Sequence, residues 1–321
     1  MSQGVALSAV NVESLLRPLS EETPCGENLR WDRRFLELER LAEGKEETQF
    51  SAAEEPDWRE VRDVANELFA RGKHLRVAVI LTLAAVRLEG YSGLRDGLKL
   101  IQGLLEQYWD QIYPQLDVED NNDPTERVNA LSPLSTPPAT YGDKLKLVDR
   151  VQQAMLCQSR QLGAFSLRDI ALAAGTQQPV GDEQVQTLAV IDAAFVETDA
   201  EVLNQIAAAA EEGLAALKAI ETAFNDKCGF GVGPDSSPLQ TVVKDAALQI
   251  RRRQGVDVPG EDAGAAAGAP GGSGGGGGPS GERLSGEISS GDDVLLAVDK
   301  ICRYYERSEP SSPVPLVARC V

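Results

Sequence analysis

The most hydrophobic stretch of the chain, residues 75–88, constrains its fold more than any other feature. It is apolar on nearly every side of a helix, which is the pattern of a helix packed among others. It also carries Arg76 and Arg87 and is shorter than the roughly 20 apolar residues that a membrane-spanning helix needs. The stretch therefore predicts the central, buried helix of a helical bundle.

The segments on either side of this stretch repeat their apolar residues with the period of an α-helix. Trp58, Val61 and Leu68 share one face of the first segment, and residues 94–109 form a second amphipathic face. No segment alternates convincingly between apolar and polar side chains, as a half-buried strand does. We therefore expect an all-α fold.

Proline and glycine residues suggest where these helices begin and end. Pro56 follows an acidic lead-in and is expected to be the first residue of a helix. Gly90 and Gly93 are expected to mark the turn between two helices. Residues 132–141 contain three prolines and predict an irregular hinge, after which residues 143–159 predict a further helix.

The second half of the chain is rich first in alanine and then in glycine. Residues 206–224 and 239–250 each carry an apolar seam at helical spacing, which predicts an antiparallel helical hairpin joined through residues 229–234. Thirteen of the thirty-two residues from 255 to 286 are glycine, so we expect a disordered linker there. A last apolar stripe from 292 to 305 predicts a short helix beyond the linker.

These features together predict four parts of the chain. Residues 1–174 form an N-terminal helical bundle domain and residues 175–254 a helical middle region. Residues 255–286 form the linker, and residues 287–321 form a short C-terminal helical module. The boundary near residue 174 rests on the turn-rich stretch that follows it.

The charge of the chain limits the partners that it can bind. Its formal net charge is −19, and both nucleic acids and anionic membranes recruit proteins through Lys and Arg instead. We therefore expect neither nucleic-acid binding nor membrane insertion. The one basic run, residues 251–253, is expected to lie at a helix C-terminus, where positive charge meets the negative end of the helix dipole.

The cysteines and the first residues point to the cytoplasm. The five cysteines are odd in number, widely spaced and without a Cys-x-x-Cys pair, so we expect neither a disulfide framework nor a zinc site. The chain does not start with a basic region followed by an apolar stretch, so we expect no secretory signal. A reduced, cytoplasmic protein is the resulting expectation.

No motif in the chain predicts a catalytic, cofactor-binding or metal-binding site. The glycine run 271–278 lacks the Lys and the preceding strand of a phosphate loop. The acidic segment 117–123 lacks the glycine and the closing glutamate of a calcium loop, so we interpret it as a solvated, helix-capping loop. His74 is the sole histidine and stands at a helix start, which favours a capping or surface role over catalysis.

Cys25 and the three tryptophans are the remaining candidates for a special role. Cys25 lies in a turn defined by proline and glycine, with acidic neighbours that do not activate a thiol, so we interpret it as structural. Trp58 and Trp109 are expected to be core anchors. Trp31 stands among arginines and is the tryptophan that we predict as a surface contact for a partner protein.

Several motifs occur in an order that packing alone does not require. They are Leu16-Arg17-Pro18-Leu19-Ser20, Pro24-Cys25-Gly26-Glu27-Asn28-Leu29-Arg30-Trp31-Asp32, Glu54-Glu55-Pro56-Asp57-Trp58-Arg59, Tyr108-Trp109-Asp110, Asn122-Asp123-Pro124, Arg127-Val128-Asn129-Ala130-Leu131 and Phe165-Ser166-Leu167-Arg168-Asp169. In this order they resemble the N-terminal domain of the ImpA/TssA family of the bacterial type VI secretion system. Residues 300–306 and 310–315 resemble the short C-terminal box of that family.

The resemblance implies a non-enzymatic assembly protein that is associated with the inner-membrane-docked secretion apparatus. Members of the family contact baseplate, tube, sheath and membrane-complex proteins and help to start or cap tube and sheath polymerisation. The resemblance also implies a homo-oligomer and makes Tyr304 and Tyr305, in the C-terminal box, further candidates for protein contacts.

Two other classes of function stay open at this stage. One is a free-standing helical adaptor unrelated to secretion, and the other is an enzyme with a site of dispersed carboxylates. In the family the chain continues beyond the C-terminal box, so we expect the module at residues 287–321 to be incomplete and to assemble poorly into a ring.

Overall fold

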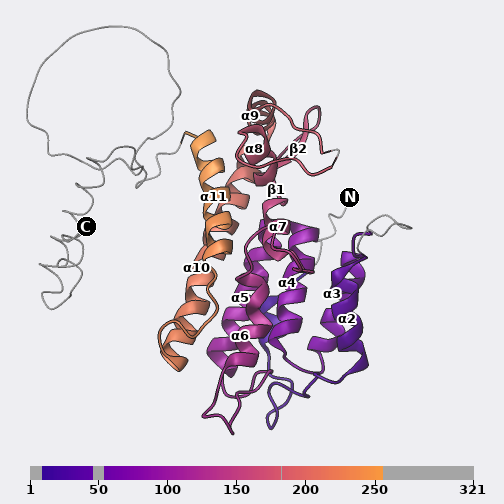
Figure 1. The fold of residues 1–321 in the computed structure, drawn as a ribbon, viewed down its shortest axis with the longest axis vertical. Helices are drawn as coiled ribbons and strands as arrows, with labels where there is room; N and C mark the ends of the chain where they lie inside the picture. Colours follow the sequence, from indigo (N-terminus) through magenta and orange to yellow (C-terminus); the bar gives the residue numbers. More distant parts are fainter. Residues whose placement is uncertain (1–8, 46–53, 182, 256–321) are drawn as a thin grey trace, which may run out of the picture. The chain divides into compact units, whose positions relative to one another are not determined.

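A computed structural model describes residues 9–45, 54–181 and 183–255, which are mostly helical (Figure 1). The described residues belong to one compact unit. The predicted module at 287–321 and nearly all of the predicted linker at 255–286 lie outside the described residues. Both therefore stay predictions.

Eleven α-helices, one 3-10 turn and one two-stranded sheet make up the described residues. In chain order they are α1 (Val12–Leu16), α2 (Arg33–Glu43), α3 (Trp58–Phe69), α4 (Leu75–Glu89), α5 (Tyr91–Tyr108), α6 (Thr125–Leu131), η1 (Ser132–Leu134), α7 (Leu147–Gln152), β1 (Met155–Ser159), β2 (Gly163–Ser166), α8 (Leu167–Ala173), α9 (Leu188–Glu197), α10 (Ala200–Cys228) and α11 (Ser237–Arg253). None of the helices in these ranges is both long and apolar enough to cross a bilayer.

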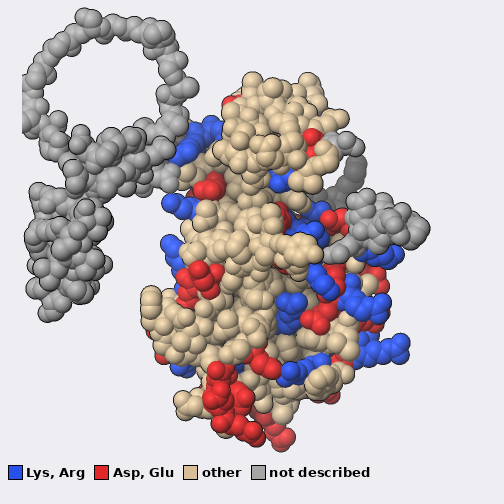
Figure 2. Space-filling view, in the orientation of Figure 1, with Lys and Arg blue, Asp and Glu red and all other residues tan. Residues whose placement is uncertain are grey.

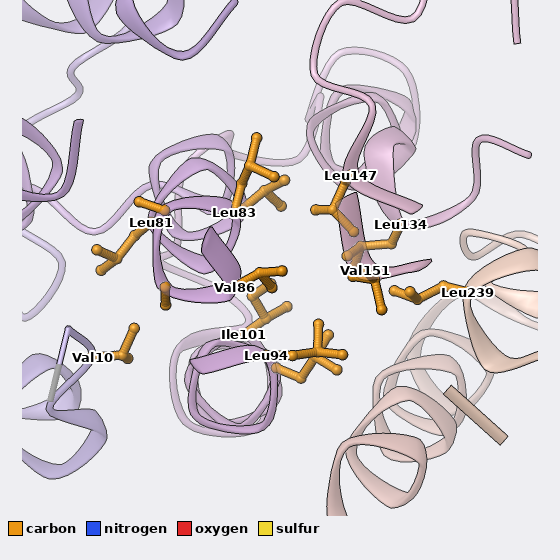
Figure 3. Close-up of a cluster of buried hydrophobic side chains, with 14 of the residues drawn as sticks. Val10, Leu81, Leu83, Val86, Leu94, Ile101, Leu134, Leu147, Val151 and Leu239 are labelled. Atoms are coloured by element: carbon orange, nitrogen blue, oxygen red, sulfur yellow. The ribbon is translucent and has the colours of Figure 1, made fainter. Parts of the chain in front are cut away.

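Helix α4 is the central helix of the bundle, as residues 75–88 predict. Eleven of its side chains are buried, from Leu75 to Val86, and it packs against α3, α5, α6 and α7. Its burial on all sides explains why its sequence is apolar all round. The core around it gathers side chains from distant segments, with Leu239 of α11 pointing toward Val151 and Leu134 (Figure 3).

Helices α4 and α5 are joined through Gly90 alone. Gly90 has φ +64°, a conformation that favours glycine, and its prediction as a turn residue is confirmed. Gly93 was predicted in the same turn but lies inside α5, which corrects that prediction. A Cβ on Gly93 would stand 2.2 Å from the carbonyl oxygen of Ala85, so this glycine lets the two helices approach closely.

Of the helix predicted over residues 143–159, only residues 147–152 are helical, so the prediction is wrong at both ends. Helix α7 ends at Gln152, and β1 pairs with β2 in an antiparallel hairpin. The edge of β1 packs against α9, where the Thr198 hydroxyl accepts a hydrogen bond from the Gln158 amide at 3.0 Å. These tertiary contacts outweigh local helix propensity, so the all-α expectation is corrected to a mostly helical fold with one small sheet.

The start of α3 also differs from the prediction. Pro56 precedes the helix, and Asp57 is the N-cap residue, whose carboxylate accepts hydrogen bonds from Arg59 N at 3.0 Å and Glu60 N at 3.3 Å. An Asp side chain satisfies free amides of the first turn, which proline at the first helical position does not do. The cap therefore sets the start of α3 at Trp58.

Helices α10 and α11 form the predicted hairpin and pack on α5 and α7. Their buried seams join the same hydrophobic cluster as the residues before position 174. The predicted boundary at residue 174 therefore does not separate two compact units in the described chain. Whether residues 1–174 fold on their own stays a prediction.

Candidate functional site

A groove on the surface of the bundle is the candidate site, because it lies beside the exposed tryptophan that the sequence singles out. It has a volume of about 520 Å³ and is built by the segment before α2, by α2 itself, by the start of α4, by the segment after α5, and by α6 with η1. Its lining residues are Asn28, Arg30, Phe35, Glu39, His74, Arg76, Pro114, Gln115, Glu126, Asn129, Ala130 and Ser132. We call it the Arg30–Arg76 groove.

His74 forms part of the wall of the groove at the N-cap of α4. Its Nδ1 accepts a hydrogen bond from Arg76 N at 3.1 Å, and its ring stands edge-on to Phe35 with centroids 4.8 Å apart. The side chain is only 5% exposed. The capping role predicted for the sole histidine is therefore confirmed.

The electrostatics of His74 set the chemistry that it offers. Burial, helped by the positive charges of Arg76 and Arg30, lowers its pKa to about 4. The imidazole is therefore neutral at pH 7, and because Nδ1 accepts a hydrogen bond, the ring proton is on Nε2. Nε2 has no hydrogen-bond partner among the described residues and offers one donor at the groove.

Two ion pairs brace the walls of the groove. Arg30 donates from Nη1 to Glu126 at 2.9 Å and so ties the segment before α2 to α6. Arg76 donates from Nε to Glu39 at 3.2 Å and so ties α4 to α2. Basic and acidic side chains are interspersed over this side of the molecule, where α2 and α3 lie (Figure 2). The two arginines and two glutamates of these ion pairs carry no net charge, so the groove does not select a ligand by net charge.

Arg127 positions the segment that closes one end of the groove. It is fully buried, and its guanidinium lies 4.8 Å from the centre of the Trp109 ring. It donates hydrogen bonds to the carbonyl oxygens of Pro114 at 2.7 Å and Ile112 at 3.1 Å. Arg127 thus holds Pro114 against the groove. The Arg-x-Asn-Ala-Leu motif therefore has a structural role.

Trp31 stands at the edge of the groove and is 84% exposed. The guanidinium of Arg30, which lines the groove, lies 5.4 Å from the centre of the indole ring. A large aromatic side chain held beside a cation is typical of a residue that anchors a protein partner. Its role as a contact stays a prediction, as do those of Tyr304 and Tyr305, which lie outside the described residues.

The other tryptophans lie in the core, as the sequence predicts, and the acidic segment precedes α6. Trp58 and Trp109 are buried, at 9% and 6% exposure. In the acidic segment, Asp123 accepts a hydrogen bond from Thr125 N at 2.6 Å, but the N-cap residue of α6 is Pro124, and no side chain caps this helix. Across the described ranges no group of three metal-ligating side chains gathers.

Cys25 is built into the fold. Its carbonyl accepts a hydrogen bond from Lys73 N at 2.8 Å, and its thiol is buried. Burial raises the pKa of the thiol to about 11, against the opposing charges of Lys73 and Arg127. A thiol that stays protonated at neutral pH is a poor nucleophile.

Sequence reasoning did not find the groove itself. Its residues come from five segments between positions 28 and 132, so no local spacing brings them together. It also passed over Phe230, which is 95% exposed in the loop between α10 and α11. A phenylalanine between two glycines, Gly229 and Gly231, was the available signal.

Comparison with known proteins gives the family. Residues 16–136 match the family described as "ImpA, N-terminal, type VI secretion system". The chain is also 38% identical to the type VI secretion system component TssA1 of Pseudomonas aeruginosa over 324 residues, which cover 97% of this chain and 90% of that protein. The chain belongs to the TssA family. The resemblance seen in its motifs is thereby confirmed, and the chain is a type VI secretion system component with a role in assembling that system.

A solved structure shows the same fold. It is the N-terminal domain, with its ImpA_N region, of the TssA component of the type VI secretion system from Burkholderia cenocepacia. It superposes on this TssA-family chain with a TM-score of 0.62 at 24% identity, over 80% of this chain and 99% of that one. The Arg30–Arg76 groove lies wholly within the stretch that matches the family, whereas Phe230 lies outside it.

Proposed function

We propose that this chain acts at the baseplate of the secretion apparatus and helps to start or cap the polymerisation of tube and sheath. The observation that carries the proposal is its 38% identity to TssA1 over 97% of its length. This relation to a secretion component also decides against a free-standing adaptor unrelated to secretion.

The chain performs this role through protein contacts and without catalysing a reaction. Two side chains that most often do chemistry, His74 and Cys25, are used here to build the fold. Their pKa values lie far from neutrality, at about 4 and about 11, so neither exchanges a proton readily at pH 7. Such groups support a scaffold better than an active site.

The partners in this proposal are baseplate, tube, sheath and membrane-complex proteins, together with further copies of the chain. Trp31 is the contact that we assign to the described body, since it is an exposed aromatic residue beside a groove. Tyr304 and Tyr305 are the contacts that we assign to the C-terminal module. We place the protein in the bacterial cytoplasm, on the side where baseplate and sheath assemble.

Time-lapse microscopy tests this proposal in the bacterium that carries the gene. The chain and a baseplate protein are each fused to a different fluorescent protein, and a sheath protein to a third. We expect the chain to coincide with the baseplate focus before the sheath begins to extend. A chain that stays diffuse while sheaths form would overturn the proposal.

A further inference from the structure

The loop between α10 and α11, residues 229–236, exposes two apolar side chains at its tip. Phe230 is 95% exposed and Val232 is 41% exposed. Gly229 and Gly231 flank Phe230 with φ values of +93° and +78°, which turn the backbone so that the ring stands away from the hairpin. We call these residues the Phe230 loop.

The base of the loop is pinned to α10 by hydrogen bonds. Glu221 Oε1 accepts from Ser236 N at 3.2 Å, from Ser236 Oγ at 2.7 Å and from Gln240 Nε2 at 2.8 Å. Asn225 Oδ1 accepts from Gly231 N at 3.2 Å, directly after Phe230. The backbone on both sides of the exposed tip is therefore held in place.

Packing holds the loop from below as well. Gly233 lies against the fully buried Phe224, and a Cβ on Gly233 would stand 2.6 Å from the Cβ of Phe224. The loop thus presents Phe230 from a fixed backbone, which lowers the entropy lost when the ring enters a partner's pocket. This separates Phe230 from the scattered single apolar residues that any protein surface carries.

The surroundings of the loop are acidic. Between positions 221 and 237 the chain carries Glu221, Asp226 and Asp235 against Lys227 alone. The charges of the buried Arg127 and of Asp123 both act on Cys228, so the acidic segment 117–123 lies near this end of α10. Acidic side chains gather at the same lower end of the molecule in Figure 2. A partner that binds this end of α10 therefore contacts the apolar side chains of the Phe230 loop with carboxylates around them.

We propose that the Phe230 loop docks into an apolar pocket of a partner protein whose rim carries Lys and Arg side chains. Phe230 is the anchor, Val232 adds apolar area, and the carboxylates pair with the rim. A second copy of this chain that docked through the same loop is a poor occupant, because the carboxylates around the two loops would repel one another. The inference rests on the proposed function in that the partner belongs to the secretion apparatus.

The first test is complementation of a strain that lacks the gene. Wild type, Phe230→Ala and the matched control Val196→Ala, which removes a side chain 86% exposed on α9, are each supplied, and tube protein secreted into the medium is measured. We expect Val196→Ala to restore secretion and Phe230→Ala to leave it at least about tenfold lower. Equal thermal unfolding of the three purified chains shows that folding is unaffected.

The outcomes separate the inference from the proposed function. If the strain without the gene secretes normally, the proposed function fails, and the inference with it. If that strain does not secrete and Phe230→Ala restores secretion fully, the proposed function stands and the inference is wrong.

The second test identifies the occupant. A photoreactive benzoylphenylalanine replaces Phe230, the cells are irradiated, and the protein captured is purified and its binding to the chain measured at rising salt. We expect a protein of the apparatus whose affinity for the chain falls at least about tenfold with Phe230→Ala, stays unchanged with Val196→Ala, and weakens as salt rises. Capture of a second copy, capture of the chain's own residues 256–321, or equal affinity for Phe230→Ala would overturn the inference.

Discussion

The ring of Phe224 on α10 stands edge-on against the indole of Trp109, with ring centroids 5.2 Å apart and planes at 83°. Trp109 follows α5, and the two residues are far apart in the sequence. Phe224 is fully buried, and its contact with Trp109 joins the alanine-rich hairpin to the bundle. The hairpin is therefore an integral part of the described fold.

Phe224→Ala should lower the free energy of unfolding by about 3–5 kcal/mol, because it leaves a cavity and an uncovered indole. Phe230→Ala makes the same change six residues later, on an exposed side chain, and should alter stability by less than about 0.5 kcal/mol. Urea unfolding followed by circular dichroism compares the two variants. Equal losses for both would show that the hairpin does not depend on the Trp109 contact.

A second matched pair concerns the tryptophans. The indole of Trp58 is covered by the Arg150 guanidinium at 4.6 Å, and its Nε1 donates to Glu55 at 3.3 Å. Trp58→Ala should therefore cost about 3–5 kcal/mol of unfolding free energy. Trp31→Ala should change it by less than about 0.5 kcal/mol, because that side chain lies in water. A large loss for Trp31→Ala would mean that Trp31 supports the fold instead of contacting a partner.

These tryptophans show what the sequence could predict. The spacing of Trp58 with Val61 and Leu68 placed it in the core, because helical period alone decides which side chains share a face. The same reasoning found α4 and the α10–α11 hairpin. Residues 155–159 were missed because what holds them as a strand is the pairing with β2 and the packing of α9, and neither is visible in local spacing.

The sequence could not predict the groove for a related reason. His74 and Arg76 are close in sequence, but the residues opposite them on α2 and α6 are brought there by tertiary packing. The sequence could say that His74 stands at a helix start. It could not say that Phe35 would cover its ring and so shift its pKa.

Replacing two helical glycines, Gly93 and Gly213, by alanine should change the free energy of unfolding in opposite directions. A Cβ on Gly93 would overlap the carbonyl oxygen of Ala85 at 2.2 Å, so Gly93→Ala should cost about 1–3 kcal/mol of unfolding free energy. A Cβ on Gly213, inside α10, would meet Leu98 Cδ1 at an ordinary 3.6 Å. Gly213→Ala should therefore add up to about 1 kcal/mol, since alanine favours a helix. Thermal unfolding of both variants checks the signs, and a stabilised Gly93→Ala would contradict the close crossing of α4 and α5.

His74 should make the free energy of unfolding depend on pH between about 4 and 6.5. The folded state binds the proton with a pKa of about 4, against 6.5 for the ordinary group, so between these values the unfolded chain takes up a proton that the folded chain does not. The contribution of the neutral His74 to the free energy of unfolding is fully present above pH 6.5 and is lost as the pH falls. At a pH of about 5 the loss is about 2 kcal/mol. Asp32, whose pKa the Arg71 hydrogen bond holds below its usual range, titrates below this window.

The control for this pH dependence is His74→Asn, which keeps a capping side chain and removes the titrating group. Urea unfolding measures the free energy of unfolding at several pH values from about 7 to about 5. We expect this free energy to fall with pH in the wild type and to change much less in the variant. Because His74 is the sole histidine, parallel slopes would show that its ring is accessible to protons in the folded state.

The most direct measurement of the central claim, a role in assembling the secretion apparatus, is a count of sheaths in living cells. A fluorescent sheath protein is followed in the wild type, in a strain without the gene, and in that strain supplied with the chain. We predict that sheath assembly events nearly disappear without the gene and return when the chain is supplied. Sheaths that form and contract as often without the gene as with it would contradict the account.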